Sequence, residues 1–190
     1  MSHADSKAGL TILEGMRQHG VTTILVAAAL AVQGATLMSA QTPVPAGIVN
    51  FSRISPTIAC GGATEPWAMT ALAAEGFKTV INVRLASEPG VADEEAVVTR
   101  AGMTYIHVPM DSMAPTVASA NHFLEVIADP SIQPVYIHCA SANRVGALWA
   151  IKRVVQDGWT REHAIEEGQA IGLKSQVLLD FVHRFLDGRH

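Results

Sequence analysis

Charged and aromatic side chains are both scarce in this sequence. Of its 190 residues, 16% are charged and 5% are aromatic, and the formal net charge is −4. A protein that binds nucleic-acid backbones needs a basic stripe or patch, and this composition does not supply one. We therefore expect no nucleic-acid partner. A small anionic ligand still fits the composition, because one arginine and the N-terminus of a helix can bind it locally.

Cysteine is equally scarce, since the chain contains only Cys60 and Cys139. A disulfide between them would be expected in an oxidising compartment, and it would lock Cys139 in an unreactive state. The interpretation that we favour is that Cys60 is an inert core residue, because a buried free cysteine behaves as a small apolar side chain.

A long uncharged stretch lies near the N-terminus. Residues 21–40 are apolar or small throughout, with a short basic lead before them and a proline-bearing spacer after them. This layout is typical of a secretory signal, and the run is also long enough to anchor in a bilayer. We expect residues 1–40 to be a signal peptide, cut after Ala40, or an N-terminal anchor; a buried core helix is the remaining alternative. Residues 41–47 are then a linker and residues 48–190 a folded domain.

Residues 1–40 also predict the location of the folded domain. Either a signal or an anchor places the domain outside the cytoplasm, in the periplasm or the medium. Contact with a membrane is expected only through the N-terminal segment, if that segment is not cleaved.

Strand and helix patterns alternate along the rest of the chain. The expected strands are residues 48–54, 57–60, 78–83, 103–108 and 135–138; the expected helices are residues 65–74, 93–100, 116–128, 160–170 and 175–186, with another after Arg144. Such alternation predicts an α/β fold with a mainly parallel central sheet and helices on both faces. Ligands bind beyond the carboxyl ends of parallel strands, which is where Arg84, Asp111 and Cys139 are expected.

The segment that follows the predicted strand Val135–His138 has the features of an oxyanion-binding loop. Cys139 begins the loop, Arg144 ends it, and an apolar helical pattern follows. The backbone N–H groups of residues 140–143 (Ala140, Ser141, Ala142 and Asn143) would converge at the N-terminus of that helix. Arg144 adds a bidentate fork, and a thiol in this field is expected to lose its proton readily. We predict that Cys139 is a reactive nucleophile.

Three further side chains are candidates for the same site. A cation at a helix N-terminus is unfavourable, so Arg144 should have an anionic partner, either the thiolate or a bound oxyanion. Asp111 is a candidate general acid, although an aspartate in a loop is often only a turn former. Arg84 either adds positive potential to the substrate site or pairs with Glu88. His138 is expected to brace the loop rather than to act as a base.

These residues resemble a known superfamily. The strand, Cys139, the loop and Arg144 resemble the protein tyrosine and dual-specificity phosphatases, and are most similar to the beta-lactamase-hydrolase-like phosphatase domain. The resemblance extends upstream through residues 54–62 and 75–84 and places Asp111 where the family has its general acid. It implies a phosphatase-like fold and a phosphocysteine at Cys139 with its oxygens held by Arg144 and the loop amides. It also implies a phosphorylated substrate, no metal and no cofactor.

The loop departs from the family pattern in three ways. Four residues separate Cys139 from Arg144 where the phosphatases have five, Ala142 replaces a glycine, and Val145 replaces a hydroxyl residue. Four is also the spacing of the rhodanese sulfurtransferases, in which the cysteine carries a persulfide. A sulfurtransferase and a non-catalytic phosphate-binding module are therefore alternatives to the phosphatase.

Overall fold

The computed structural model describes residues 45–188. The predicted leader and most of the predicted linker lie outside the described residues. Within residues 45–188, no helix is both long and apolar enough to cross a membrane.

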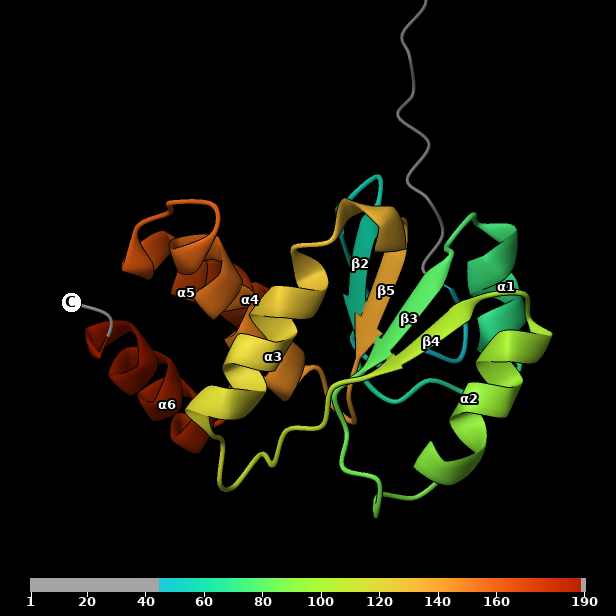
Figure 1. The fold of residues 1–190 in the computed structure, drawn as a ribbon, viewed down its shortest axis with the longest axis horizontal. Coiled ribbons are helices and arrows are strands. Elements are labelled where there is room, and N and C mark those ends of the chain that lie inside the picture. The colour runs from blue at the N-terminus through green and yellow to red at the C-terminus, as the bar shows by residue number, and fades with distance from the viewer. Residues whose placement is uncertain (1–44, 189–190) are drawn as a thin grey trace, which may run out of the picture. The chain divides into compact units, whose positions relative to one another are not determined.

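A five-stranded sheet forms the centre of the described part (Figure 1). Its strand order is β1-β2-β5-β3-β4. β2, β5, β3 and β4 run parallel to one another, and β1 pairs antiparallel with β2 at one edge. The mainly parallel sheet predicted from the sequence is thus confirmed. The strands are β1 (Ser52–Ser55), β2 (Ile58–Gly61), β3 (Thr79–Asn82), β4 (Thr104–His107) and β5 (Val135–His138).

Helices cover both faces of the sheet (Figure 1). Alternating strand residues divide between two cores, as the two-residue period of a strand requires. Val80 and Tyr136 face α1 and α2, whereas Ile81 and Ile137 face α3 and α4. α5 and α6 pack against α4 on its far side. The helices are α1 (Ala68–Ala74), α2 (Val91–Arg100), α3 (Val117–Ile127), α4 (Asn143–Val155), α5 (Arg161–Ile171) and α6 (Gln176–Asp187).

The largest differences from the predicted elements lie near the N-terminus. The strand predicted at 48–54 begins only at Ser52, because Ile48 forms an isolated bridge with Thr64. The helix predicted from Glu65 begins at Ala68. Thr64, which directly precedes the predicted helix, does not cap it; its hydroxyl hydrogen-bonds the Tyr136 hydroxyl (2.7 Å) and the Gly62 carbonyl (3.1 Å).

Candidate active site

The loop between β5 and α4 has the conformation of an anion-binding turn. Cys139 follows β5 directly and is 1% exposed. Ala142 is the N-cap of α4 with a φ of 64° and a ψ of 0°, in the left-handed region. An alanine in this region costs about 1–2 kcal/mol, so the surrounding structure must hold it there. The loop thus takes the conformation that a glycine would adopt more easily.

Neighbouring segments hold the loop by its carbonyl groups. The Ala140 carbonyl accepts a hydrogen bond from the Ala63 amide (2.8 Å), and the Ser141 carbonyl accepts one from Asn50 Nδ2 (3.1 Å). In a planar trans peptide the following N–H points the opposite way. The N–H groups of residues 140–142 donate no hydrogen bond to another group within the described chain. These amides are therefore available to an oxyanion.

Arg144 lies beside the thiol and is held firmly. Its side chain is 6% exposed, and Nη1 and Nη2 donate to the two carboxylate oxygens of Glu88 at 2.5 and 2.8 Å. Nη1 also donates to the Met110 carbonyl (3.1 Å). Burial alone would lower the pKa of Arg144, but Glu88 and the neighbouring Cys139 sulfur raise it above its ordinary value. Arg144 is therefore a permanent cation. The anionic partner predicted for it was the thiolate or a bound oxyanion, whereas its ion-pair partner in the structure is Glu88.

Arg84 does not pair with Glu88. Its guanidinium pairs with Glu94, and it donates to the Pro89 carbonyl (3.1 Å) and to Asn82 Oδ1 (3.4 Å). The structure thus places Arg84 at the expected end of the sheet, but with its charge already balanced.

Asp111 lies on the loop that contacts Arg144 through the Met110 carbonyl. Its carboxylate accepts hydrogen bonds from the backbone amides of Met113 (2.8 Å) and Ala114 (3.3 Å). The side chain therefore stabilises its own turn in this conformation. Both bonds go to Oδ1, and Oδ2 makes no hydrogen bond within the described residues, so Oδ2 is the oxygen from which a general acid would donate its proton.

Asn143 connects the loop to the start of α6. Its Oδ1 accepts from the amides of Lys174 (2.7 Å) and Ser175 (2.8 Å), while Nδ2 donates to Ser141 Oγ (3.1 Å). The side chains of Ser141 and Asn143 therefore bond to each other and to the protein, so a ligand would be bound by the backbone N–H groups of the loop rather than by these side chains.

A buried polar cluster that the sequence analysis did not predict lies next to the loop. Glu94, 4% exposed, contacts His138 Nε2 (2.5 Å), accepts from Asn82 Nδ2 (2.7 Å) and pairs with Arg84. Burial alone would raise the pKa of Glu94, but His138 and Arg84 hold it below its ordinary value. One sequence signal pointed to this burial, because Glu94 shares a helical stripe with the buried Val91 and Val98.

The two cysteines are free thiols in this structure. Cys60 pairs in register with Ile137, so it lies on the sheet face to which Ile137 and Cys139 belong. Burial is the largest cause that raises the pKa of the Cys60 thiol, far above its ordinary value. Cys60 thus has the properties of an inert core residue.

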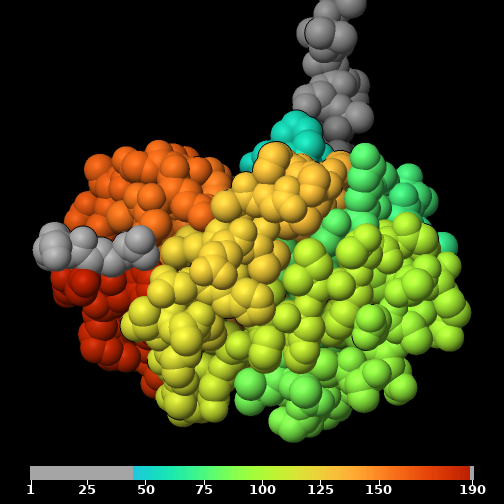
Figure 2. All heavy atoms as spheres, in the orientation of Figure 1, coloured from blue at the N-terminus to red at the C-terminus, as the bar shows by residue number. Residues whose placement is uncertain are grey.

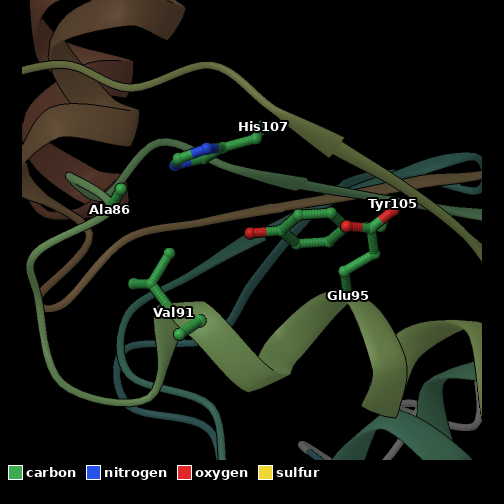
Figure 3. A pocket seen from close by; sticks show the side chains of 6 residues that line it. Ala86, Val91, Glu95, Tyr105 and His107 are labelled. Carbon is green, nitrogen blue, oxygen red and sulfur yellow. The ribbon is translucent and has the colours of Figure 1, made fainter.

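The loops that follow β3 and β4 lie side by side at the lower edge of Figures 1 and 2, at the carboxyl ends of the strands. The β3 loop carries Arg84 and Glu88, and it also forms part of the wall of a pocket of about 370 Å³. Figure 3 shows this pocket with Tyr105 and His107, whose rings stack with centroids 6.1 Å apart. The His107 Nε2 contacts the Arg84 carbonyl at 2.7 Å, which fixes the start of the loop.

Residues 54–180 match the family of DSP-PTPase phosphatases fused to NAD⁺ kinase. The chain belongs to this family. Membership agrees with the cysteine-phosphatase-like fold and with the superfamily resemblance seen in the sequence, and it supports a hydrolase of the phosphatase type.

Curated relatives are similar to this chain over part of their own length. A beta-lactamase hydrolase-like protein of Xylella fastidiosa is 32% identical over 104 residues, which are 53% of this chain and 24% of the relative. Its namesake in Agrobacterium fabrum is 31% identical over 100 residues, which are 50% of this chain and 23% of the relative. The match thus spans about a quarter of the length of these relatives.

Solved structures share the fold. A DUF442 protein from Shewanella putrefaciens is 25% identical with a TM-score of 0.60, covering 73% of this chain and 91% of that chain. TpbA from P. aeruginosa, solved with phosphotyrosine, is 23% identical with a TM-score of 0.61, covering 75% and 86%. The core catalytic domain of the PP-IP phosphatase SIW14 from S. cerevisiae is 18% identical with a TM-score of 0.62, covering 75% and 87%.

Proposed function

We propose that this protein hydrolyses phosphate monoesters through a covalent phosphocysteine at Cys139. The observation that carries the proposal is the placement of Cys139 and the buried Arg144 at the two ends of a loop whose three amides, those of residues 140–142, make no hydrogen bond within the described residues. A phosphoryl group bonded to the sulfur could place its oxygens against these donors. The charge that develops there would be stabilised by groups that are already in position.

The reaction has two steps. In the first, the Cys139 thiolate attacks phosphorus, the bond between phosphorus and the ester oxygen breaks, and Asp111 protonates the departing oxygen. In the second, water attacks phosphorus, the phosphorus–sulfur bond breaks, and phosphate and the thiolate are released. Asp111 accepts the proton of the attacking water. In both steps Asp111 Oδ2 would transfer the proton, because Oδ1 accepts from the Met113 and Ala114 amides.

Arg84 and the amides complete the proposed substrate site in different ways. Ala140, Ser141, Ala142 and Asn143 would bind the phosphoryl oxygens through their backbones. Arg84 would contribute at most a weak long-range attraction, because Glu94 neutralises it.

The test is an assay of residues 41–190 on an aryl phosphate and on thiosulfate with a thiol acceptor. We expect hydrolysis of the phosphate, abolished by Cys139→Ser and reduced about 10²–10⁴-fold by Asp111→Asn. Sulfur transfer from thiosulfate that is insensitive to Asp111→Asn would overturn the proposal in favour of a persulfide carrier. Stabilisation by phosphate or vanadate without any turnover would identify a binding module instead.

We also propose that residues 1–40 direct export of the domain, as a signal peptide or as an anchor. The support is the uncharged run at residues 21–40 behind a basic lead. Fusion of residues 1–47 to a reporter that is active only outside the cytoplasm should give activity, and deletion of residues 21–40 should abolish it. Reporter activity that persists after the deletion would contradict the proposal.

A further inference from the structure

We propose that Glu94 is a positioning residue that holds both reactive side chains, Cys139 through His138 and Arg144 through the loop after β3. The inference deepens the proposed function and rests on it, because a loss of turnover in a Glu94 variant is meaningful only if the protein is a phosphatase. The contacts from which the inference is argued do not depend on that function. Glu94 lies on α2, across the sheet from α4, and touches neither reactive side chain itself.

The first connection runs through His138, which is fully buried. Its Nε2 lies 2.5 Å from Glu94 Oε1. Since an ionised carboxylate can only accept, this contact assigns the proton to Nε2; Nδ1 has no hydrogen-bond partner within the described residues. The imidazole stacks on Tyr136 with centroids 5.5 Å apart and 7° between the rings. Its backbone carbonyl accepts from the Val83 amide (3.0 Å). His138 is thus fixed at the ring and at the backbone, and Cys139 is the next residue.

The second connection runs through Arg84, whose guanidinium pairs with the other oxygen of Glu94. The Arg84 amide donates to Asn82 Oδ1 (2.8 Å), and its carbonyl contacts His107 Nε2 (2.7 Å). The loop that begins here turns back at Leu85, whose amide donates to Glu88 Oε1 (2.7 Å). That same oxygen accepts from Arg144 Nη1 (2.5 Å). The position of the oxyanion-binding arginine therefore depends on a loop anchored at Glu94.

Loss of the charge at Glu94 would release both connections. In Glu94→Gln the side chain keeps its shape, but its NH₂ group replaces one carboxylate oxygen and faces donors in either orientation: His138 at the position of Oε1, or Asn82 and Arg84 at the position of Oε2. Arg84 would also lose its counter-ion in a site where its side chain is 12% exposed. A buried cation without a partner is strongly unfavourable. Arg84 and His138 would both move, and a displacement of about 1 Å at reacting groups lowers rates by up to about 10²-fold.

The first measurement needs no turnover. The rate at which iodoacetamide alkylates Cys139 is followed against pH, with the labelled cysteine identified by mass spectrometry. Removal of a negative charge by itself favours the thiolate, so a purely electrostatic effect of Glu94→Gln would move the profile to lower pH. Loss of positioning weakens the contacts that stabilise the thiolate and moves the profile to higher pH. We expect the shift to higher pH; no shift, or a shift to lower pH, would overturn the inference.

The second measurement is the kinetics of aryl phosphate hydrolysis. We expect kcat of Glu94→Gln to fall about 10–100-fold with a smaller change in KM. The matched control is Glu95→Gln, which makes the same charge change one residue further along α2 at an exposed position. It should leave both kcat and the alkylation profile at their wild-type values. Equal effects of the two variants would overturn the inference.

The positioning role of Glu94 and the phosphatase proposal can be contradicted independently. If the wild-type protein hydrolyses nothing and the alkylation profile still moves to higher pH in Glu94→Gln, the positioning role stands and the phosphatase proposal falls. Should Glu94→Gln not fold, Glu94→Asp takes its place. Its shorter carboxylate keeps the charge but cannot span His138 and Arg84, and the same two measurements decide with the same outcomes.

Discussion

At the scale of single residues, the site depends on ion pairs more than on exposed charge. Cys139 and Arg144 were predicted from a local pattern, because strand, loop and helix follow one another directly in the sequence. The acids that position them were not predicted. Glu88 is one acid among several in the region of α2, and only the fold brings it against Arg144, 56 residues away. Glu94 lies in a run of three acids that looks like an ordinary first helical turn.

The pairing of Glu88 with Arg144 leads to a prediction for stability. Glu88→Ala should lower the free energy of unfolding by about 1–3 kcal/mol, because it leaves a buried guanidinium without its charged acceptor. Urea denaturation of the variant measures the loss. The control is Ser87→Ala at the adjacent exposed position. A difference of less than about 0.5 kcal/mol between the two variants would mean that the ion pair contributes nothing measurable.

At the scale of elements, local patterns predicted the core of the sheet well. β5 was predicted to the residue, and α3, α5 and α6 to within one or two residues at each end. These elements have clear periodicity and clear caps, such as Thr116 and Thr160. The early segment was less predictable, because Ile48 bridges to Thr64 and does not extend β1, and because Tyr136 binds the hydroxyl of Thr64. Such long-range contacts cannot be predicted from the local sequence.

The connection between α5 and α6 supports the left-handed turn of the active-site loop. A Cβ atom on Gly172, at a φ of 149°, would lie 2.8 Å from the Cβ of Ala142. We expect Gly172→Ala to destabilise the protein by about 1–3 kcal/mol through overpacking. The double variant with Ala142→Gly should recover part of the loss, with a coupling of about 0.5–3 kcal/mol in a double-mutant cycle.

The control for this cycle is Gly102→Ala. It has a positive φ of 84° and no atom within 4 Å of the added Cβ, so it measures the backbone cost alone. If Gly172→Ala is no worse than Gly102→Ala, or if the double variant is simply additive, the connection does not hold the loop.

At the scale of the whole molecule, the same acids make stability depend on pH. The Arg144 hydrogen bonds are the main cause that lowers the pKa of Glu88 from its ordinary value of 4.5. The pKa of Glu94 is also below 4.5, where its contacts with His138 and Arg84 outweigh the effect of burial. A carboxylate with a lower pKa in the folded state binds fewer protons there than in the unfolded chain. Its contribution to stability is therefore present above pH 4.5 and is lost as the pH falls through the folded-state pKa.

We accordingly expect the free energy of unfolding to change little between pH 7 and pH 5 on account of these two acids, and to fall steeply below about pH 4.5. Each proton taken up on unfolding adds a slope of about 1.4 kcal/mol per pH unit. Urea denaturation at a series of pH values measures this slope for the wild-type protein and for Glu88→Gln. The variant lacks one of the two groups, so it should be less stable at pH 7 and lose less stability on acidification. An equal slope in both proteins would show that Glu88 takes up no proton in this range, and the ion pair with Arg144 would then not couple stability to pH.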